Sequence, residues 1–162
     1  MKLNEAQKIA QQYIELFRPH CLRVAVGGSV RREKPEVGDI ELVVIPDKYH
    51  LEMFILGQKF DIRKNGAKYK QLYLPKEAVQ LDLFICTPET WGMNFMIRTG
   101  SANYTKSFMS ELHRRGFTSK DARLYRYDQL SKEAIGEPLS TPEESSVYIT
   151  TGIPWKEPRE RV

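Results

Sequence analysis

The sequence is poor in the side chains that bind zinc or form disulfide scaffolds. Its 162 residues include 2 cysteines and 3 histidines. Zinc sites gather Cys and His at short, regular spacings, and no such spacing occurs here. Cys21 and Cys86 each lie in or beside an apolar segment. We therefore expect two buried free thiols in a reducing compartment rather than a structural disulfide.

Long apolar runs are also missing. No run approaches the roughly 20 residues that a membrane-spanning helix requires. The first twelve residues, MKLNEAQKIAQQ, lack the hydrophobic stretch of a secretory signal. We therefore expect no membrane partner and an intracellular, cytoplasmic location. The 41% apolar and 28% charged residues are ordinary for a globular chain, which at this length forms one domain or two small lobes.

The charge is only mildly basic, with a formal net charge of +4. This value permits a polyanionic partner without requiring one. Residues 59–76 and 98–133 are both rich in Lys and Arg. Basic surface beside an acidic centre would suit an enzyme that handles nucleic acid, and solvated helix faces explain the same charges equally well.

Hydrophobic periodicity and turn residues predict both helices and strands. Helices are expected over residues 4–17, 89–98, 103–115 and 141–152. Strands are expected over residues 22–26, 40–45, 59–63, 69–74, 81–86 and 124–130. Asn4 and Thr141 are the expected N-caps of the first and last helices. Asn65-Gly66 is a strong hairpin signal between the third and fourth strands.

The character of the sequence changes after Pro88, from strand-rich to helix-rich. We therefore expect two lobes, covering residues 1–88 and 89–162. The predicted class is α+β, with a mixed sheet flanked by helices in the first lobe and a small α/β arrangement in the second.

Three acidic residues interrupt otherwise apolar strands. Asp39 and Glu41 stand two positions apart, so their side chains project to the same face, while Ile40 points into the core. Asp82 is a single acid in the later strand. Like charges held side by side repel, and burying them is costly without a cation. Carboxylate oxygens are the ligands that Mg²⁺ prefers, so the pattern favours a divalent metal site.

A glycine turn precedes the acid pair. Residues 27–29 read Gly-Gly-Ser and are followed by Arg31-Arg32. Backbone N–H groups, a hydroxyl and guanidinium groups at such a turn are the donors that a triphosphate binds. By itself the turn is better explained as an ordinary tight turn, and Asp82 alone could be a solvent-facing edge residue. Together the three features favour a phosphate site beside two metal ions.

The motifs resemble those of a known family. GGSVRR, GDIEL, QLDLF, RTGSANYTKSF, GEPL, TPEE and IPWKEPRER follow one another in the order found in family X DNA polymerases, which are nucleotidyltransferases. The similarity covers residues 22–161. It implies a polymerase palm in the first lobe and, in the second, a lobe that closes over the nascent base pair.

The resemblance also implies roles for individual residues. Metal binding and catalysis fall to Asp39, Glu41 and Asp82, with two Mg²⁺ ions that Mn²⁺ can replace. Contacts with the incoming nucleotide fall to Gly28, Ser29, Arg32, Gly38, Arg98, Gly100, Ser101 and Thr105. A contact with nucleic acid falls to Lys106. The implied activity is transfer of a nucleotide from a dNTP to a primer 3′-hydroxyl on a DNA template, including short-gap filling in repair.

Three departures from the family pattern affect these expectations. Glu41 stands where these polymerases usually carry Asp, and Ile97-Arg98 stands where an aromatic pair usually discriminates between sugars. The lyase and helix-hairpin-helix segments of the repair polymerases have no counterpart in the sequence. We therefore expect a monomer with weak, salt-sensitive DNA binding, open to an accessory DNA-binding partner. Template-independent addition to DNA or RNA ends and a catalytically silent nucleic-acid-binding module remain as alternatives.

Overall fold

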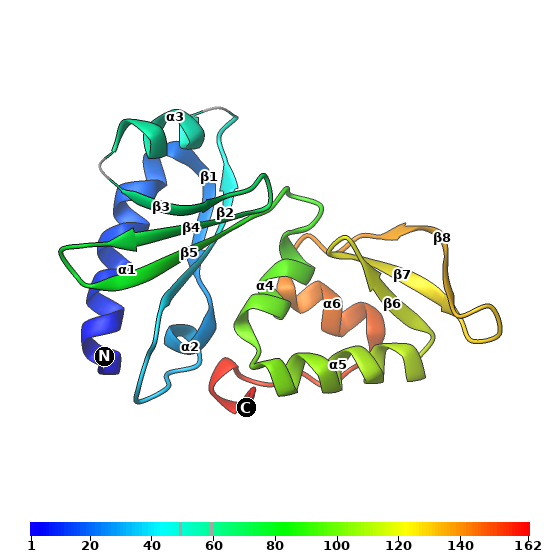
Figure 1. Ribbon diagram of the computed structural model, residues 1–162. Helices are drawn as coiled ribbons and strands as arrows, with labels where there is room; N and C mark the ends of the chain where they lie inside the picture. The colour runs from blue at the N-terminus through cyan, green and yellow to red at the C-terminus, as the bar shows by residue number, and fades with distance from the viewer. Residues whose placement is uncertain (49, 59) are drawn as a thin grey trace. The chain divides into compact units, whose positions relative to one another are not determined.

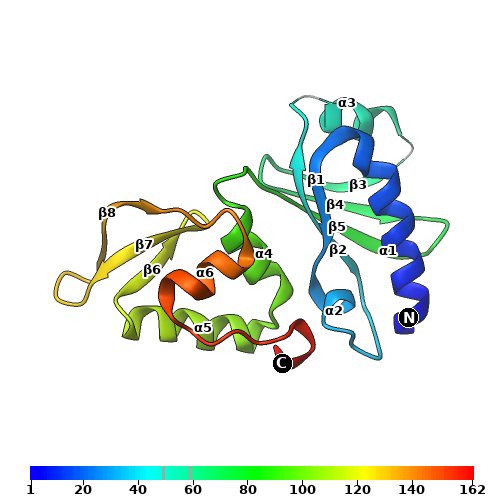
Figure 2. The ribbon, with the colours of Figure 1, turned by 180° about the vertical axis from the view of Figure 1, so that it is seen from behind.

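In the computed structural model, which describes residues 1–48, 50–58 and 60–162, a sheet organises the first of two units. The units are Met1–Thr87 and Pro88–Val162. They can be followed along the chain in Figure 1 and, from behind, in Figure 2. The division falls one residue before the boundary expected from the sequence.

The sheet of the first unit has five strands in the order β1-β2-β5-β4-β3. The strands are β1 (Cys21–Val26), β2 (Ile40–Pro46), β3 (Asp61–Asn65), β4 (Tyr69–Leu74) and β5 (Val79–Ile85). Strands β2 and β5 are parallel, whereas the other neighbours are antiparallel. The mixed sheet confirms the α+β class predicted from the sequence.

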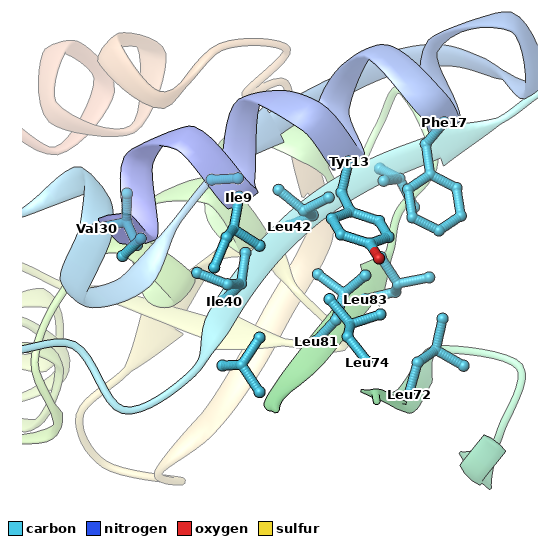
Figure 3. Close-up of a cluster of buried hydrophobic side chains, with 14 of the residues drawn as sticks. Ile9, Tyr13, Phe17, Val30, Ile40, Leu42, Leu72, Leu74, Leu81 and Leu83 are labelled. Carbon is cyan, nitrogen blue, oxygen red and sulfur yellow. The ribbon is translucent and has the colours of Figure 1, made fainter. Parts of the chain in front are cut away.

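Helices cover one face of this sheet. They are α1 (Leu3–Phe17), the 3₁₀ turn η1 (Arg18–His20), the short α2 (Gly28–Arg31) and α3 (His50–Gly57). Figure 3 shows side chains of α1 meeting apolar side chains of the strands. The core includes Ile9, Tyr13, Phe17, Ile40, Leu42, Leu72, Leu74, Leu81 and Leu83. Because strand side chains alternate, the residues between these strand positions face the opposite side.

The start of α1 differs from the prediction. Its N-cap is Lys2, whereas Asn4 lies inside the first turn, where its Oδ1 accepts a hydrogen bond from the backbone N–H of Glu5 at 2.9 Å. The reason is tertiary. Lys2 forms a β-bridge with Glu36, and the N–H of Leu3 donates to the carbonyl of Pro35 at 3.1 Å. These long-range bonds start the helix before its best local cap.

Helix α3 was not predicted from the sequence. Its residues are apolar at almost every position, so they carry no clear helical period. Phe54 from this helix stacks on His20, with ring centroids 4.0 Å apart. The predicted strand start at Lys59 lies outside the described residues, and β3 begins at Asp61.

A charged pair lies on the helix-covered face of the same sheet. Lys70 in β4 is only 4% exposed, and its amine lies 2.6 Å from a carboxylate oxygen of Glu52 in α3. The amine also donates to the side chain of Asn65. Hydrogen bonding to Lys70 lowers the pKa of Glu52. This buried lysine is therefore neutralised by a partner within its own unit.

The second unit contains a three-stranded antiparallel sheet and three α-helices. The strands, in the order β6-β7-β8, are β6 (Phe117–Lys120), β7 (Arg123–Asp128) and β8 (Glu133–Leu139). The helices are α4 (Trp91–Thr99), α5 (Ala102–Arg114) and α6 (Glu144–Thr151), followed by the 3₁₀ turn η2 (Pro158–Glu160). As predicted, α5 buries Tyr104, Phe108 and Leu112.

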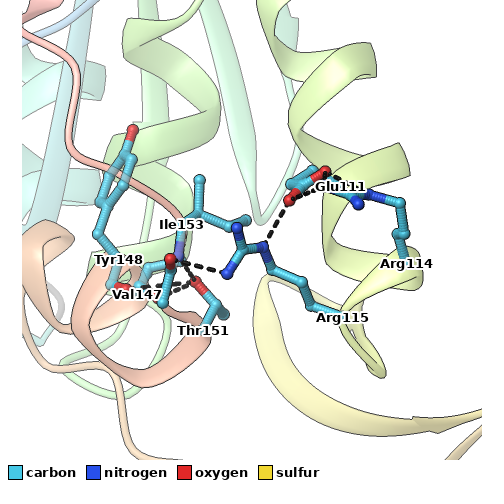
Figure 4. A network of polar contacts seen from close by, with 8 residues as sticks. Glu111, Arg114, Arg115, Val147, Tyr148, Thr151 and Ile153 are labelled. Carbon is cyan, nitrogen blue, oxygen red and sulfur yellow. Dashed lines mark hydrogen bonds and ion pairs between the residues drawn. The ribbon is translucent and has the colours of Figure 1, made fainter.

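Polar contacts join the ends of two helices in this unit (Figure 4). Arg115 follows α5, pairs with Glu111 and donates to the carbonyl of Gly152 at 2.8 Å. Thr151 donates to the carbonyl of Val147 at 2.7 Å. Gly152 closes α6 with φ at 68°, as the sequence predicted.

The start of α6 and two of the strands differ from the predictions. Glu143, not Thr141, is the N-cap, and it forms a capping box with Ser146. The carbonyl of Thr141 instead accepts a hydrogen bond from the N–H of Gly92 at 3.2 Å, so residue 141 lies in a loop against α4. Strands β6 and β8 were not predicted, since the first is short and the second contains Gly136 and Pro138.

None of the helices in the described part of the chain combines the length and apolar character that crossing a bilayer requires. The two cysteines are free thiols. Cys86 is buried, and Cys21 is half-buried. Burial raises the pKa of the Cys21 thiol to about 12.

Candidate active site

The first unit places its three predicted catalytic acids on neighbouring positions of two strands. Asp39 directly precedes β2, Glu41 is its second residue, and Asp82 lies in β5. Glu41 and Asp82 are register partners in the parallel pair β2–β5. Since Ile40, Leu42, Leu81 and Leu83 point into the core, the acids occupy the other face. The register thus brings together residues that are more than forty positions apart in the sequence.

Asp39 and Asp82 interact as like charges. The pKa of Asp39 is raised, first by burial and then by the negative charge of Asp82. Its own backbone N–H and the guanidinium of Arg32 oppose this rise. A carboxylate whose pKa is raised in this way is stabilised when a cation binds nearby.

Asp82 is held by neutral hydrogen-bond donors. It is 7% exposed, and its Oδ1 accepts from the hydroxyl of Tyr69 at 3.0 Å. The amide of Gln80 donates to both carboxylate oxygens, at 3.0 and 3.1 Å, and Gln71 donates to Oδ1 at 3.4 Å. Burial, and then the bond to Asp82, raise the pKa of Tyr69 to about 12, so Tyr69 is a neutral donor at pH 7.

Sequence reasoning missed these three neighbours of Asp82. Gln80 lies two positions before Asp82 on the same face, and Gln71 is its register partner on β4. Tyr69 lies two positions before Gln71. A signal was present, because polar and aromatic side chains alternate with buried ones along β4. Using it required the register of β4 against β5, which a single sequence does not give.

Gly28 is tightly joined to Glu41. Its φ is +55°, and a Cβ atom built at this position would lie 1.5 Å from Oε2 of Glu41. The backbone of the turn is bonded to the same strand, because the N–H of Gly27 donates to the carbonyl of Glu41 at 2.8 Å. A side chain at position 28 is therefore excluded by both backbone conformation and space.

Two of the other predicted phosphate contacts, Ser29 and Arg32, lie in the short helix that follows this turn and at its end. Ser29 follows Gly28, and its Oγ is buried without a hydrogen-bond partner among the described residues. Arg32 ends α2, and its pKa is lowered by burial while Glu41 and Asp39 counteract this effect. Gly38 is exposed, with open space where a Cβ would lie. An unpartnered hydroxyl and a half-buried guanidinium are suited to an anionic ligand.

The three acids have the donor atoms of a magnesium site. Their carboxylate oxygens are hard donors that suit Mg²⁺, and the raised pKa of Asp39 reflects negative charge that a cation would offset. The donor chemistry therefore fits a divalent ion. However, no three His, Cys, Asp or Glu side chains among the described residues gather as a group able to hold a metal. The carboxylate oxygens of Asp82 instead accept hydrogen bonds from Tyr69, Gln71 and Gln80. The two-ion site stays a prediction.

The predicted sugar and base contacts lie in the second unit, at the junction of α4 and α5. A Cβ at Gly100 would lie 2.7 Å from Cδ1 of Tyr104 and 2.9 Å from Oγ1 of Thr105. Ser101 is the N-cap of α5, and its Oγ accepts from the N–H of Tyr104 at 3.0 Å. The hydroxyl of Thr105 donates to the carbonyl of Ile97 at 3.4 Å. These side chains thus build a tight turn.

Two basic residues flank this turn. Arg98 is half-buried in the last turn of α4, and Lys106 is exposed on α5. The hydroxyls of Ser101 and Thr105 are hydrogen-bonded within the unit. Their contacts with a nucleotide stay predictions. The exposed amine of Lys106 is suited to a phosphate.

Comparisons with known proteins add independent information. The chain is 26% identical to "DNA polymerase lambda" of Rattus norvegicus, with 99% of the chain and 33% of the rat protein aligned. It is 23% identical to "Repair DNA polymerase X" of African swine fever virus (isolate Pig/Kenya/KEN-50/1950), with 93% of the chain and 86% of the viral protein aligned. The chain therefore spans about a third of the length of the rat protein. No protein-family model matches it.

Proposed function

Because the chain is related in sequence to the family X DNA polymerases, we propose that it transfers a nucleotide from a dNTP to the 3′-hydroxyl of a primer on a DNA template. The observation that carries this proposal is the β2–β5 register, which sets Glu41 beside Asp82 on the face opposite the core. Asp39 joins them within reach of electrostatic interaction. In this proposal the first unit is the palm, and the second is the lobe that closes over the nascent base pair.

Asp39, Glu41 and Asp82 would hold two Mg²⁺ ions, which Mn²⁺ can replace. When bound, such ions would neutralise the triphosphate and lower the pKa of the attacking hydroxyl. Asp82 accepts the hydroxyl proton or orients the hydroxyl that loses it. A bond then forms between the primer oxygen and the α-phosphorus, and the bond to pyrophosphate breaks. Tyr69, Gln71 and Gln80 keep the carboxylate of Asp82 in place until that step.

The turn that contains Gly28 binds the triphosphate in this scheme. The hydroxyl of Ser29, which has no partner among the described residues, donates to a phosphate oxygen, and Arg32 supplies a guanidinium. Gly38, which is exposed with open space where a Cβ would lie, is the remaining expected phosphate contact. These donors act on oxygens that gain negative charge as pyrophosphate leaves.

The second unit contributes contacts with the rest of the substrate. Arg98, Gly100 and Ser101 belong to the segment under the incoming sugar and base. Thr105 and Lys106 contact the nascent base pair. We expect the protein to act as a monomer on DNA inside the cell. Its DNA binding is weak, and it is salt-sensitive because it rests on contacts between basic side chains and phosphates. Filling of short gaps in repair, and an accessory DNA-binding partner, are part of this proposal.

One observation favours a different function. Since no three-acid metal-binding group is formed within the described residues, a catalytically silent module that binds nucleic acid is the second candidate. It predicts DNA binding without incorporation. Template-independent addition to DNA or RNA ends is a third outcome, which differs by its indifference to the template base.

The test is primer extension on three matched substrates: a gapped duplex, an open primer–template and a primer without template. Each is run with Mg²⁺ or Mn²⁺ and with deoxy- or ribonucleotides. Template-directed incorporation that is greatest on the gap supports the proposal. Equal incorporation without template would establish the terminal transferase. Binding of the DNA substrates without incorporation in either metal would establish the silent module.

A further inference from the structure

The C-terminal tail of the second unit contains a buried arginine. Arg161 is 0% exposed, although its neighbours Glu160 and Val162 are exposed. It directly follows the 3₁₀ turn η2 (Pro158–Glu160). Removing a guanidinium from water is costly, so such a side chain persists only where it makes specific bonds.

Arg161 has partners in two segments of the unit. Its Nη1 pairs with Oε1 of Glu144, which is 4% exposed at the start of α6. Its Nε donates to the carbonyl of Lys156 at 2.9 Å. The remaining nitrogen, Nη2, is buried without a hydrogen-bond partner among the described residues.

Three aromatic rings surround the same guanidinium. Its central carbon lies 4.7 Å from the ring centroid of Trp155, 5.4 Å from that of Tyr148 and 5.8 Å from that of Tyr104. Cations are attracted to the faces of such rings, most strongly where water is excluded. The hydroxyls of Tyr104 and Tyr148 are hydrogen-bonded to each other at 2.9 Å. The tail, α5 and α6 are thus joined around one side chain.

Arg161 also reaches the turn between α4 and α5. Its backbone carbonyl accepts a hydrogen bond from the N–H of Ser101 at 3.3 Å. Its side chain lies against Tyr104, whose ring leaves no space for a side chain at Gly100. Arg161 therefore touches this turn twice, through its backbone at Ser101 and through its guanidinium at Tyr104.

We propose that Arg161 is a positioning residue that fixes the turn at Gly100–Ser101 for binding of the incoming nucleotide. This inference rests on the proposed function, since that turn carries the expected sugar contacts. Arg161 does not touch the nucleotide itself. It fixes the C-terminal tail, residues 155–161, against the start of α5. We call this segment the strap, and it keeps the turn formed before a nucleotide binds.

Lysine is a poor substitute for this role. An ammonium keeps the charge that Glu144 requires but has no planar group to lie over Trp155, and it cannot bond Glu144 and the carbonyl of Lys156 with two separate nitrogens. Arg161→Lys should therefore loosen the strap while leaving the charge of the cluster unchanged. Arg159→Lys is the matched control, because Arg159 is exposed and only two positions away.

The first measurement is amide hydrogen exchange in the absence of substrate. In Arg161→Lys we expect faster exchange at residues 101–105 by about tenfold, as for loss of one charge-assisted hydrogen bond, with strands β6 and β7 unchanged. Glu144→Gln should produce the same pattern to a lesser degree, and Arg159→Lys should match the wild type. Unchanged exchange at residues 101–105, or an equal rise across the whole unit, would overturn the proposal.

The second measurement is titration of each protein with a dNTP and Mg²⁺, followed by single-nucleotide extension. We expect Arg161→Lys to weaken dNTP binding and raise KM by about tenfold, with kcat changed less. Faster amide exchange at residues 101–105 of Arg161→Lys, together with an unchanged affinity for dNTP, would refute the positioning role. A wild-type chain that binds no dNTP would overturn the proposed function and the nucleotide part of this inference, while the exchange result would still decide whether Arg161 fixes the turn.

Discussion

Each unit contains a cluster of charged side chains. Opposite charges are paired in the cluster of the second unit, whereas like charges meet in that of the first. In the second unit Arg161 meets Glu144 and three aromatic rings, so opposite charges satisfy each other. In the first unit Asp39 and Asp82 repel, and the pKa of Asp39 is raised. The first kind of cluster holds a fold together without further partners. The second weakens the fold unless something positive binds, which is typical of a functional site.

The largest effect is expected when Asp82 is replaced, because this removes the repulsion that distinguishes the cluster of the first unit. In Asp82→Asn, nucleotide transfer should fall by at least about a thousandfold, because the proposed metal ligand and proton acceptor is lost. Stability to urea should stay level or rise, since the repulsion with Asp39 disappears. Asp61→Asn, at an exposed position of the same sheet, is the control and should extend primers normally. Near wild-type transfer by Asp82→Asn would contradict the assigned role.

The next largest effect is expected at the glycine turn. In Gly28→Ala, the positive φ costs roughly 1–2 kcal/mol, and the new methyl group also displaces the carboxylate of Glu41. Both the urea midpoint and primer extension should therefore fall. Gly38→Ala is a matched control, because its Cβ enters open space and should change stability by no more than about 0.5 kcal/mol. Equal stability of the two variants would show that the contact with Glu41 is unimportant.

A smaller effect is expected from the neutral donors around Asp82. Tyr69→Phe removes the hydroxyl at 3.0 Å from Oδ1 but keeps the stacking on Phe84. Loss of one hydrogen bond of about 1 kcal/mol should slow extension about fivefold. The control is Tyr73→Phe, four positions along the same strand, which should extend at the wild-type rate. An unaffected rate in Tyr69→Phe would mean that Asp82 needs no such support.

The smallest effect is expected for the ion pair between Lys70 and Glu52 in the first unit. Lys70 lowers the pKa of Glu52 below its usual 4.5, so the pair stabilises the fold above that pH. This stabilisation should be lost as the pH falls through the lowered pKa. Urea unfolding of the wild type and Glu52→Gln should therefore differ at pH 7 and converge as the pH falls below the lowered pKa of Glu52. A difference that persists at the lower pH would exclude the ion pair as its source.

The acidic residues illustrate what local sequence can predict. The two-residue spacing of Asp39 and Glu41, and the isolation of Asp82 in an apolar strand, made all three candidates without a structure, because side-chain alternation is a local rule. The family resemblance based on these motifs is confirmed by the rat and viral relatives. The assigned roles of the individual residues stay predictions.

Features that depend on long-range pairing were missed. Gln71 and Tyr69 reach Asp82 only through the register of β4 against β5. Arg161 meets Glu144 and Ser101, which lie 17 and 60 residues earlier in the sequence. The incorrect caps at Asn4 and Thr141 have the same origin, since tertiary bonds moved each helix start. Local preference therefore predicted elements well and their partners poorly.

The contact between Gly28 and Glu41 makes two positions of the sequence interdependent. Glutamate at position 41 is one methylene longer than aspartate, and the end of that longer arm occupies the volume where residue 28 would otherwise carry a side chain. Shortening the acid would open a gap at the glycine, and enlarging the glycine would push the acid away. Any redesign toward the more usual aspartate must therefore rebuild both positions at once.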